Sequence, residues 1–431
     1  MRPTAPVPEA DRRRWPAGAR CGRLPAVDAS RLTTWIEIDE GAYAHNLGFF
    51  RRLVGPRVEL AAVIKANAYG HGLLEIARLA ARHGADSFCV FELDEALALR
   101  RAGFDQDVLI LGHTPLARLD EVVAEDFRQV LFNRRSLDAL AAIVARTGRR
   151  CRLHLKLETG THRLGVDEGR LADFLARLAA SPGLELEGVY THLANVEDTT
   201  DHRYARRQLE RFEGMCERIA AAGFKRVKRH AACTAAALVV PSTHLDLVRL
   251  GIGQYGLWPS KETLLSYKLR HHLGDGAAQV LRPVLTWKAR IAQLKEVAAG
   301  SYVGYGCTYQ TTRRTRIAVL PVGYADGYDR RLSNQAHVLV GGRRAPVRGR
   351  VCMNLIMVDV TDVPGVALED EAVLLGRQGE QTVSAEHLAA LAGTISYEIV
   401  ARLRPGIPRL VRSPTATASR PQSQIGPTTR W

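Results

Sequence analysis

Lysine is scarce in this sequence, since only eight of its 60 Lys and Arg residues are Lys, although the net charge is +15. Long hydrophobic runs are absent too, because no apolar stretch approaches the roughly 18 residues that a membrane span requires. The first 30 residues lack the apolar core of a secretory signal. We therefore expect a soluble, cytoplasmic chain that neither crosses nor binds a membrane.

Paired cysteines are also lacking. The seven cysteines are scattered without the spacing typical of zinc ligands, and an odd number fits reduced thiols in a cytosol. We expect neither a disulfide nor a metal site. Basic segments such as residues 12–14 contain no interleaved aromatic residues, and the excess of Arg over Lys indicates a general bias in residue usage. We therefore expect no nucleic-acid partner.

Short β-branched runs alternate with amphipathic helical patterns between residues 56 and 250. Eight strands alternating with helices predict an α/β fold, a closed parallel (β/α)8 barrel of the TIM type. An open doubly wound sheet is the alternative. In a barrel, the active site lies at the carboxyl ends of the strands. The predicted strands are residues 58–64, 86–90, 108–111, 129–132, 152–157, 186–191, 227–232 and 245–250.

The pattern changes after residue 259. We assign residues 32–259 to the barrel and residues 260–278 to a helical or irregular connection. Residues 279–412 contain strand-like runs punctuated by glycine, which predict a mainly β C-terminal domain. The ends, residues 1–31 and 413–431, are poor in apolar residues and rich in Pro, Ser and Thr, so we expect them to be disordered.

Two of the few lysines, Lys65 and Lys156, lie in apolar strands. A lysine can lose its proton and act as a nucleophile, whereas an arginine stays charged. The segment AAVIKANAYGHG (61–72) places Lys65 at a strand end, followed by a glycine-containing turn with Tyr69. Burial there lowers the pKa of a lysine and suits it to react with an aldehyde cofactor. A lysine that extends from the strand end to solvent is the alternative.

Nine patterns, one of them part of the Lys65 segment, occur in order along residues 33–412: WIEIDEGAYAHNL, KANAYGHG, HLKLETGTHRLG, GVYTHLAN, VRLGIGQYGL, VGYG, VGYADGY, GRVCMN and ISYE. Through them the sequence resembles the alanine racemases, which consist of a barrel and a C-terminal β domain. The resemblance implies a homodimeric isomerase that interconverts L-alanine and D-alanine and supplies D-alanine for peptidoglycan. It implies pyridoxal 5'-phosphate as the cofactor, held as a Schiff base on Lys65.

The resemblance also implies which residues hold this cofactor. Arg249, with His230 beside it, is expected to face the pyridine nitrogen, where a permanently charged guanidinium disfavours a protonated ring. A glycine-rich turn after the eighth strand suits an anion, because its backbone N–H groups point outward. The residues implied for the phosphate are Tyr69, Thr234, Gly251, Ile252 and Tyr397.

Racemisation removes a proton from one face of Cα and returns it to the other, which requires two acid–base groups. The resemblance assigns these roles to Lys65 and to Tyr305 of the partner subunit, with His192 as a polar neighbour of the tyrosine. Arg163 is implied to contact the cofactor phenolate and the substrate carboxylate, and Met353 to offer the carboxylate its backbone N–H.

Lys156 matches a lysine that is often carbamylated in this family. The alternative is an ordinary amine paired with Glu158. Cys233 stands where a polar amide is common in the family.

Three functional hypotheses follow. The first is alanine racemase. The second is another reaction on the same scaffold, either racemisation of a broader range of amino acids or decarboxylation. The C-terminal signature of the decarboxylases is absent from the sequence, as is the closely spaced His and Cys pair of metal-dependent aldolases. The third is a non-catalytic cofactor carrier, which the predicted β domain disfavours because such carriers are single barrels.

Overall fold

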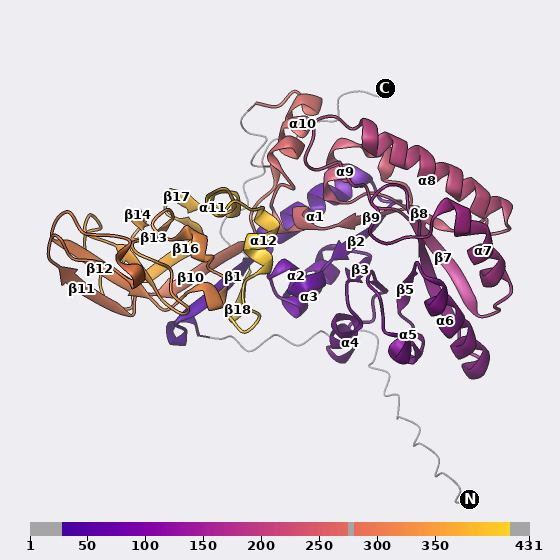
Figure 1. Cartoon of the computed structure of the whole chain (residues 1–431), viewed down its shortest axis with the longest axis horizontal. Coiled ribbons are helices and arrows are strands. Elements are labelled where there is room, and N and C mark those ends of the chain that lie inside the picture. The colour runs from indigo at the N-terminus through magenta and orange to yellow at the C-terminus, as the bar shows by residue number, and fades with distance from the viewer. Residues whose placement is uncertain (1–27, 275–279, 414–431) are drawn as a thin grey trace, which may run out of the picture.

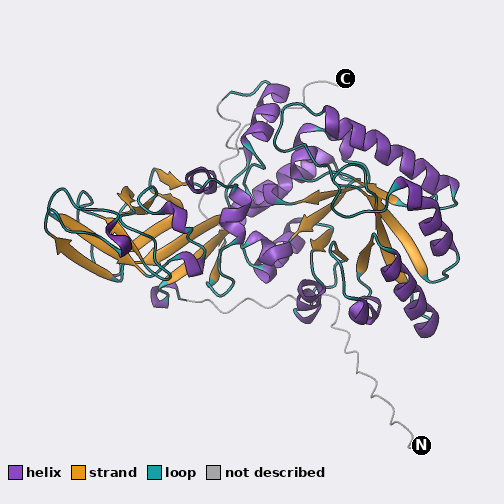
Figure 2. Ribbon diagram, in the orientation of Figure 1, coloured by secondary structure: helices purple, strands orange, loops and turns teal. Residues whose placement is uncertain are grey.

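The computed structural model describes residues 28–274 and 280–413, which form a parallel barrel and a β domain beside it (Figures 1 and 2). The barrel sheet has eight strands in the order β8-β7-β6-β5-β4-β3-β2-β9, and all its pairs are parallel. The strands are β2 (Glu59–Val63), β3 (Ser87–Val90), β4 (Val108–Ile110), β5 (Arg128–Leu131), β6 (Cys151–Lys156), β7 (Leu184–Tyr190), β8 (Lys228–His230) and β9 (Leu247–Leu250).

Backbone hydrogen bonds close this sheet into a barrel. The N–H of Asp246 donates to the carbonyl of Arg229 at 3.0 Å, and the N–H of Arg249 donates to that of Ala232 at 3.1 Å. These bonds join the β8 and β9 segments, which are the two ends of the strand order. The predicted (β/α)8 class is confirmed, and each of the eight predicted strands overlaps one observed strand.

Helices cover the outside of the barrel (Figure 2). Their apolar residues recur with helical spacing, so that α3 buries Ile76, Ala77, Leu79 and Ala80 on one face. Glycines in the left-handed conformation end α3 at Gly84 and α6 at Gly148. The helices are α1 (Glu40–Val54), α2 (Lys65–Tyr69), α3 (Leu73–His83), α4 (Leu93–Arg101), α5 (Leu119–Ala124), α6 (Arg134–Thr147), α7 (Leu171–Ala179), α8 (Arg203–Ala221) and α9 (Thr234–Val239).

The second domain is built from two sheets. The larger has the order β14-β13-β16-β10-β1-β18, with β17 paired to β16, and the smaller has the order β11-β12-β15. Its strands are β1 (Thr34–Asp39), β10 (Leu285–Arg290), β11 (Gln293–Val297), β12 (Thr315–Leu320), β13 (His337–Val340), β14 (Arg343–Pro346), β15 (Ile356–Asp359), β16 (Glu371–Gln378), β17 (Gln381–Val383) and β18 (Arg409–Arg412). Helices α11 (Ala385–Ala392) and α12 (Ser396–Ala401) lie toward the barrel, and α10 (Lys261–His271) lies in the connection (Figure 1).

The first strand corrects our domain boundaries. Strand β1 pairs antiparallel with β10 and parallel with β18, so residues 34–39 belong to the β domain and the assignment of 32–259 to the barrel begins too early. Residues 29–31 form a 3-10 turn, contrary to the disorder expected for them, while the rest of the predicted disordered ends, 1–27 and 414–431, lies outside the described residues. Among the described residues, no helix is long and apolar enough to cross a membrane.

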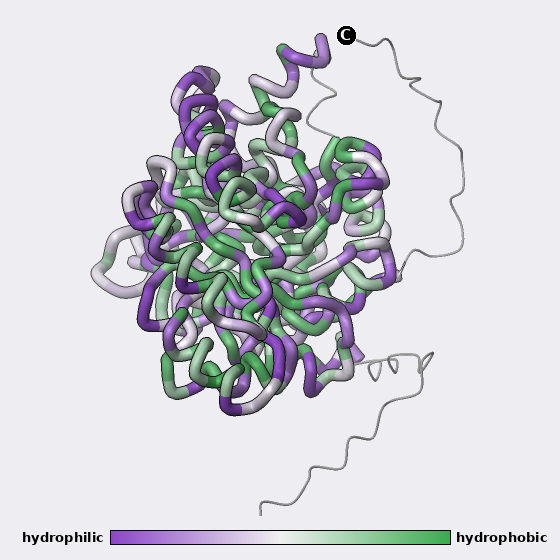
Figure 3. Tube along the Cα trace, turned by 90° about the vertical axis from the view of Figure 1, so that its right-hand side faces the viewer, coloured by the Kyte–Doolittle hydropathy of each residue, from purple (hydrophilic) through white to green (hydrophobic). Residues whose placement is uncertain are grey.

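The interior of the barrel is filled by an apolar cluster and by charged side chains toward the amino ends of the strands. In the view onto the barrel, hydrophobic segments gather at the centre and hydrophilic ones mainly at the periphery (Figure 3). Side chains from several strands pack together inside, namely Ala61, Val63, Cys89, Leu109, Val130, Tyr190 and Leu247. Buried Arg128, Arg152 and His154 also lie within the sheet. Buried side chains therefore occupy the interior of the barrel, and the strand ends that they hold together can position functional groups.

Candidate active site

A cavity of about 700 Å³ lies at the carboxyl ends of the barrel strands. Residues that end or follow β2, β3, β4, β6, β7, β8 and β9 line it, and α12 of the β domain contributes Tyr397. This is the end at which barrels of this class carry their reacting groups. The polar lining residues are Lys65, Tyr69, Lys156, Arg163, Tyr190, His192, Glu197, Cys233, Thr234, Arg249 and Tyr397.

A left-handed turn follows Lys65 directly. Ala66, Asn67, Ala68 and Tyr69 all have φ of 52° or 53°, a conformation that costs L-residues about 1–2 kcal/mol each. Local bonds hold the turn: the N–H of Ala68 donates to the carbonyl of Ile64 at 2.8 Å, and the side chain of Asn67 accepts from Leu73 at 2.9 Å. The turn brings Lys65 and Tyr69 to the same cavity.

The ammonium group of Lys65 is destabilised in this position. Burial, and next the positive charge of Arg163, lower its pKa. Its Nζ lies 5.8 Å from the centre of the Phe91 ring, which forms part of the cavity wall. The neutral form therefore makes up a larger fraction of Lys65 than of a lysine in water. Only this neutral amine can act as a nucleophile or as a base.

Arg249 is fixed beneath the cavity by a chain of histidines. Its Nη1 lies 2.8 Å from Nδ1 of His230, and Nε2 of His230 lies 2.9 Å from Nδ1 of His154. Because a guanidinium can only donate, His230 accepts at Nδ1, carries its proton on Nε2 and donates to His154. Arg249 also donates to the carbonyls of Thr191 at 2.9 Å and Ala231 at 3.2 Å.

This chain keeps both rings uncharged. Burial lowers the pKa of His154, and it lowers that of His230 further. With its Nδ1 accepting, neutral His154 carries its proton on Nε2, which faces Oε2 of Glu187 at 3.9 Å, too far for a hydrogen bond. The positive charge beneath the cavity is therefore that of Arg249.

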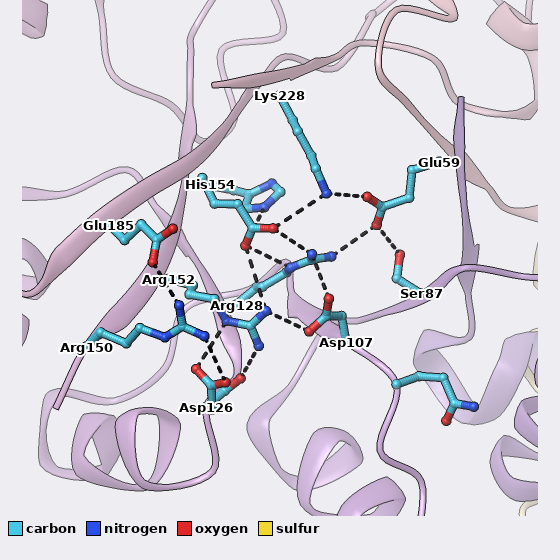
Figure 4. Close-up of polar contacts among 12 residues, drawn as sticks. Glu59, Ser87, Asp107, Asp126, Arg128, Arg150, Arg152, His154, Glu185 and Lys228 are labelled. Carbon is cyan, nitrogen blue, oxygen red and sulfur yellow. Dashed lines mark hydrogen bonds and ion pairs between the residues drawn. The ribbon is translucent and has the colours of Figure 1, made fainter. Parts of the chain in front are cut away.

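Below the histidines, a layer of ion pairs fills the amino end of the barrel (Figure 4). The guanidinium nitrogens of Arg128 lie 2.6 Å from a carboxylate oxygen of Glu187, 2.7 Å from one of Asp107 and 3.0 Å from one of Glu59. Lys228 lies 2.6 Å from Glu59. These groups come from different strands or strand ends. Their ion pairs link the strands to one another at the end of the barrel opposite to the cavity.

A cradle of hydroxyl and N–H groups lies at the other side of the cavity. The hydroxyl of Thr234 accepts from the N–H of Gly251 at 3.1 Å and from that of Gly253 at 3.3 Å. The rings of Tyr69 and Tyr397 lie 6.1 Å apart, centre to centre. Together with Ile252, these residues form a set of hydroxyl and N–H groups that lines one part of the cavity and contains no cationic side chain.

Glycine at position 70 lets the β domain approach this cradle. A Cβ atom on Gly70 would lie 1.9 Å from the carbonyl oxygen of Val400, a residue of α12. Arg409 strengthens the contact, since its Nη2 donates to the carbonyl of Gly70 at 2.8 Å. The close approach seats α12, and with it Tyr397, against the turn that follows Lys65.

Lys156 lies at the end of β6, near Arg163. Burial, and next the charges of Arg163 and Arg249, lower its pKa to about 8. The carboxylate of Glu158 accepts from the backbone N–H groups of Gly160 at 2.6 Å and Thr161 at 2.8 Å. Glu158 is thus engaged in its own turn.

Comparisons with known proteins match both domains. The alanine racemase N-terminal domain model matches residues 38–259, and the alanine racemase C-terminal domain model matches residues 284–411. The chain belongs to the alanine racemase family. Alanine racemase of Symbiobacterium thermophilum is 43% identical over 387 residues, covering 89% of this chain and 98% of that protein. Alanine racemase of Desulfosudis oleivorans is 40% identical over 398 residues, covering 90% of this chain and 99% of that protein.

Solved structures of the family share the fold. Alanine racemase from the D-cycloserine producer Streptomyces lavendulae superposes with a TM-score of 0.81 at 35% identity, covering 89% of this chain and 98% of that one. The Bacillus anthracis alanine racemase with bound L-Ala-P gives a TM-score of 0.80 at 34% identity, covering 88% and 95%. The chain therefore has the barrel and β domain of an alanine racemase.

Most residues predicted for the alanine racemase site meet in the cavity. Lys65, Tyr69, Lys156, Arg163, His192, Thr234, Arg249, Gly251, Ile252 and Tyr397 all line it. His230 lies behind Arg249 and contacts it. Burial, and next the charge of Arg249, lower the pKa of His192 to about 3, so this ring is neutral.

Tyr305 and Met353 do not line this cavity. Both are on the β domain, and their exposed fractions are 73% and 56%. Tyr305 begins a 3-10 turn (Tyr305–Cys307) between β11 and β12, the strands that lie far from the barrel in Figure 1. Within one chain, then, these two predicted site residues, of which Tyr305 was expected from the partner subunit, are separate from those of the barrel.

Glu197 also lines the cavity, although it was not among the residues predicted for the site. Both its carboxylate oxygens lie 3.2 Å from the hydroxyl of Tyr397, and the thiol of Cys233 lies 3.8 Å from one of them. Burial raises the pKa of Glu197, although the hydrogen bond from Tyr397 offsets part of this effect. The only signal in the sequence was an acid five residues after His192, in a loop where acidic residues are usually solvated.

Proposed function

We propose that this chain is a cytosolic enzyme that interconverts L-alanine and D-alanine by proton transfer at Cα, providing D-alanine for peptidoglycan. The observation that carries the proposal is the partly buried amine of Lys65, which lines one cavity together with Arg163 and Arg249. Membership of the alanine racemase family across both domains supports the reaction. Pyridoxal phosphate, when bound, supplies an aldehyde for Lys65 and a ring that accepts the electron pair left by the α-proton.

The cradle residues fit a phosphate group. A Cβ atom on Gly251 would lie 3.1 Å from the Tyr69 hydroxyl and 3.7 Å from that of Thr234, so a larger residue would enter the space between them. Tyr69, Thr234, Gly251, Ile252 and Tyr397 would hold the phosphate through hydroxyl and N–H groups. Lys65 lies in the same cavity, where it would bind the aldehyde.

Two groups would move the proton. The Lys65 amine, once the substrate amine has displaced it, takes or returns the proton at one face of Cα. The hydroxyl of Tyr305 of the partner subunit does so at the other face, with neutral His192 as its polar neighbour. Arg163 binds the substrate carboxylate through a charge-assisted contact, and the backbone N–H of Met353 of the partner subunit donates to it.

Arg249 would face the ring nitrogen of the cofactor. Its histidine contact and its two carbonyl contacts hold the guanidinium in place, and a guanidinium remains charged at any physiological pH. A fixed positive charge disfavours a proton on the adjacent nitrogen. Arg249 would thereby reduce the electron withdrawal that the bound cofactor supplies and would limit side reactions such as transamination.

A homodimer would complete the site. Exposed apolar and aromatic side chains of the β domain include Tyr302, Tyr305, Tyr324, Met353 and Leu355. Exposed groups of this kind mark interaction surfaces when they gather. Two of them, Tyr305 and Met353, are the residues that the proposed reaction needs at the cavity of the other subunit.

We expect the purified chain with pyridoxal phosphate to convert L-alanine to D-alanine, and to convert alanine faster than any larger amino acid. Tyr397 and the partner's Tyr305 would leave space for little beyond a methyl group. An apolar pocket discriminates by about 1–3 kcal/mol per methylene, so serine should be converted slowly. Chiral chromatography of each amino acid measures this preference. Faster racemisation of lysine or arginine than of alanine would instead support the broader racemase.

We expect Lys156 to carry a carbamate. Its pKa of about 8 leaves a substantial neutral fraction, which can add CO₂ and release a proton, and Glu158 does not pair with it. The resulting anion would lie near Arg163, where an ammonium group would add like charge. Carbon-13 NMR of protein kept in labelled bicarbonate should show a carbamate signal that Lys156→Arg removes. An unlabelled Lys156 amine under these conditions would contradict the expectation.

A further inference from the structure

Of the described residues that line the cavity, Glu197 is the one acid, and it lies in the phosphate cradle. The groups that face it are the hydroxyl of Tyr397 from α12, the thiol of Cys233 before α9, Tyr69 of α2, and the neighbouring Asp198. None of these is a cation. A carboxylate at this place would repel a bound phosphate, because both groups are anions in a poorly solvated site.

The hydroxyl of Tyr397 cannot serve both anions. It has a single proton, which it donates to Glu197, since both carboxylate oxygens lie 3.2 Å from it. The proposed function places the same hydroxyl at the cofactor phosphate. If that proton points to the phosphate, the tyrosine oxygen can only accept from Glu197, and a carboxylate has nothing to donate.

We propose that Glu197 takes up one proton from solvent when a phosphate monoester dianion binds in the cradle. The protonated carboxyl then donates to the oxygen of Tyr397, whose own proton turns to the phosphate. This inference rests on the proposed function, because it uses the phosphate position assigned there. Burial already raises the pKa of Glu197 without phosphate, which reduces the free energy needed to protonate it.

Proton uptake makes cofactor binding depend on pH. Above the pKa that Glu197 has in the free protein, each bound phosphate needs a proton from solvent, so affinity falls as pH rises, by up to about tenfold per pH unit. At pH 8 the phosphate is itself a dianion, since its second pKa is about 6, and it contributes no proton change. Replacing Glu197 by Gln keeps a donor for Tyr397 and removes the dependence.

The test is titration calorimetry of the full-length chain, freed of cofactor, with pyridoxal phosphate and with pyridoxal. Titrations at pH 8 in two buffers of different ionisation enthalpy give the number of protons taken up per ligand. Glu197→Gln removes the carboxyl that would take up the proton, and Tyr397→Phe removes the hydroxyl that Glu197 and the phosphate would share. Asp198→Asn is the matched control, because it removes an adjacent negative charge that does not contact Tyr397.

We expect wild type and Asp198→Asn to take up close to one proton more per pyridoxal phosphate than Glu197→Gln or Tyr397→Phe. With pyridoxal, which lacks the phosphate, the proteins should not differ. Equal proton numbers for wild type and both cradle variants would overturn the inference and leave the proposed function standing. Circular dichroism would reveal a variant that misfolds. In that case the other variant, together with the comparison of pyridoxal phosphate with pyridoxal, tests the inference. A wild-type chain that binds no pyridoxal phosphate would overturn both.

Discussion

Tyr305→Phe is expected to abolish racemisation in both directions while leaving exchange of the α-proton of D-alanine with solvent. Each turnover needs two bases, and this variant keeps only Lys65, which we assign to the D-alanine proton. Loss of a positioned base typically lowers a rate by about 10²–10⁴, so exchange from L-alanine should fall by that factor and exchange from D-alanine much less. Deuterium incorporation into each enantiomer in heavy water measures the difference.

A matched control lies three residues earlier. Tyr302 is also exposed, at 59%, and Tyr302→Phe removes a hydroxyl from the same segment without removing a proposed base. It should racemise alanine at the wild-type rate. Equal exchange rates from both enantiomers in Tyr305→Phe would mean that one base serves both faces, and the assignment of two bases would have to be abandoned.

The barrel and most of the cavity could be predicted because local patterns determine them. Each barrel strand is a short apolar run next to an amphipathic helix, and the carboxyl ends of parallel strands meet at one end of the barrel. Lys65 was recognisable for the same reason: it follows directly after the end of β2 and Ile64, in a chain that uses lysine rarely. Family motifs then indicated the residues that line the cavity from other strand ends.

Features that depend on distant partners could not be predicted in this way. Residues 34–39 were assigned to the barrel because they precede it in the sequence, but the hydrogen-bond partners of β1, which are β10 and β18, lie about 250 and 370 residues later in the chain. Glu197 lies in a loop, and its backbone carbonyl accepts from Thr263, at 3.2 Å, in α10. No local pattern reports such contacts.

The left-handed turn was missed for a different reason. Alanine and tyrosine disfavour positive φ, so the segment from Ala66 to Tyr69 predicts ordinary backbone. The fold maintains this conformation because the β domain packs against the turn at Gly70, which tolerates no Cβ there. Strained backbone held by its surroundings is common at functional sites, and here it positions Tyr69 beside the cradle. Local hydrogen bonds and the contact with the β domain thus hold the turn together, and only the local bonds belong to the segment itself.

Mixing two inactive variants should restore activity if the site is shared between subunits. Lys65→Ala lacks the amine that binds the cofactor, and Tyr305→Phe lacks the second base, so each homodimer is expected to be inactive. A heterodimer would join intact Lys65 of one subunit with intact Tyr305 of its partner and leave its second site with both changes. Random exchange at equal amounts gives half heterodimers, so about a quarter of the wild-type activity should return. Subunit exchange must be verified independently, for example by mass spectrometry of differently tagged subunits. Activity that stays at zero once heterodimers are present would place both bases in one chain, which the separation of Tyr305 from the cavity argues against.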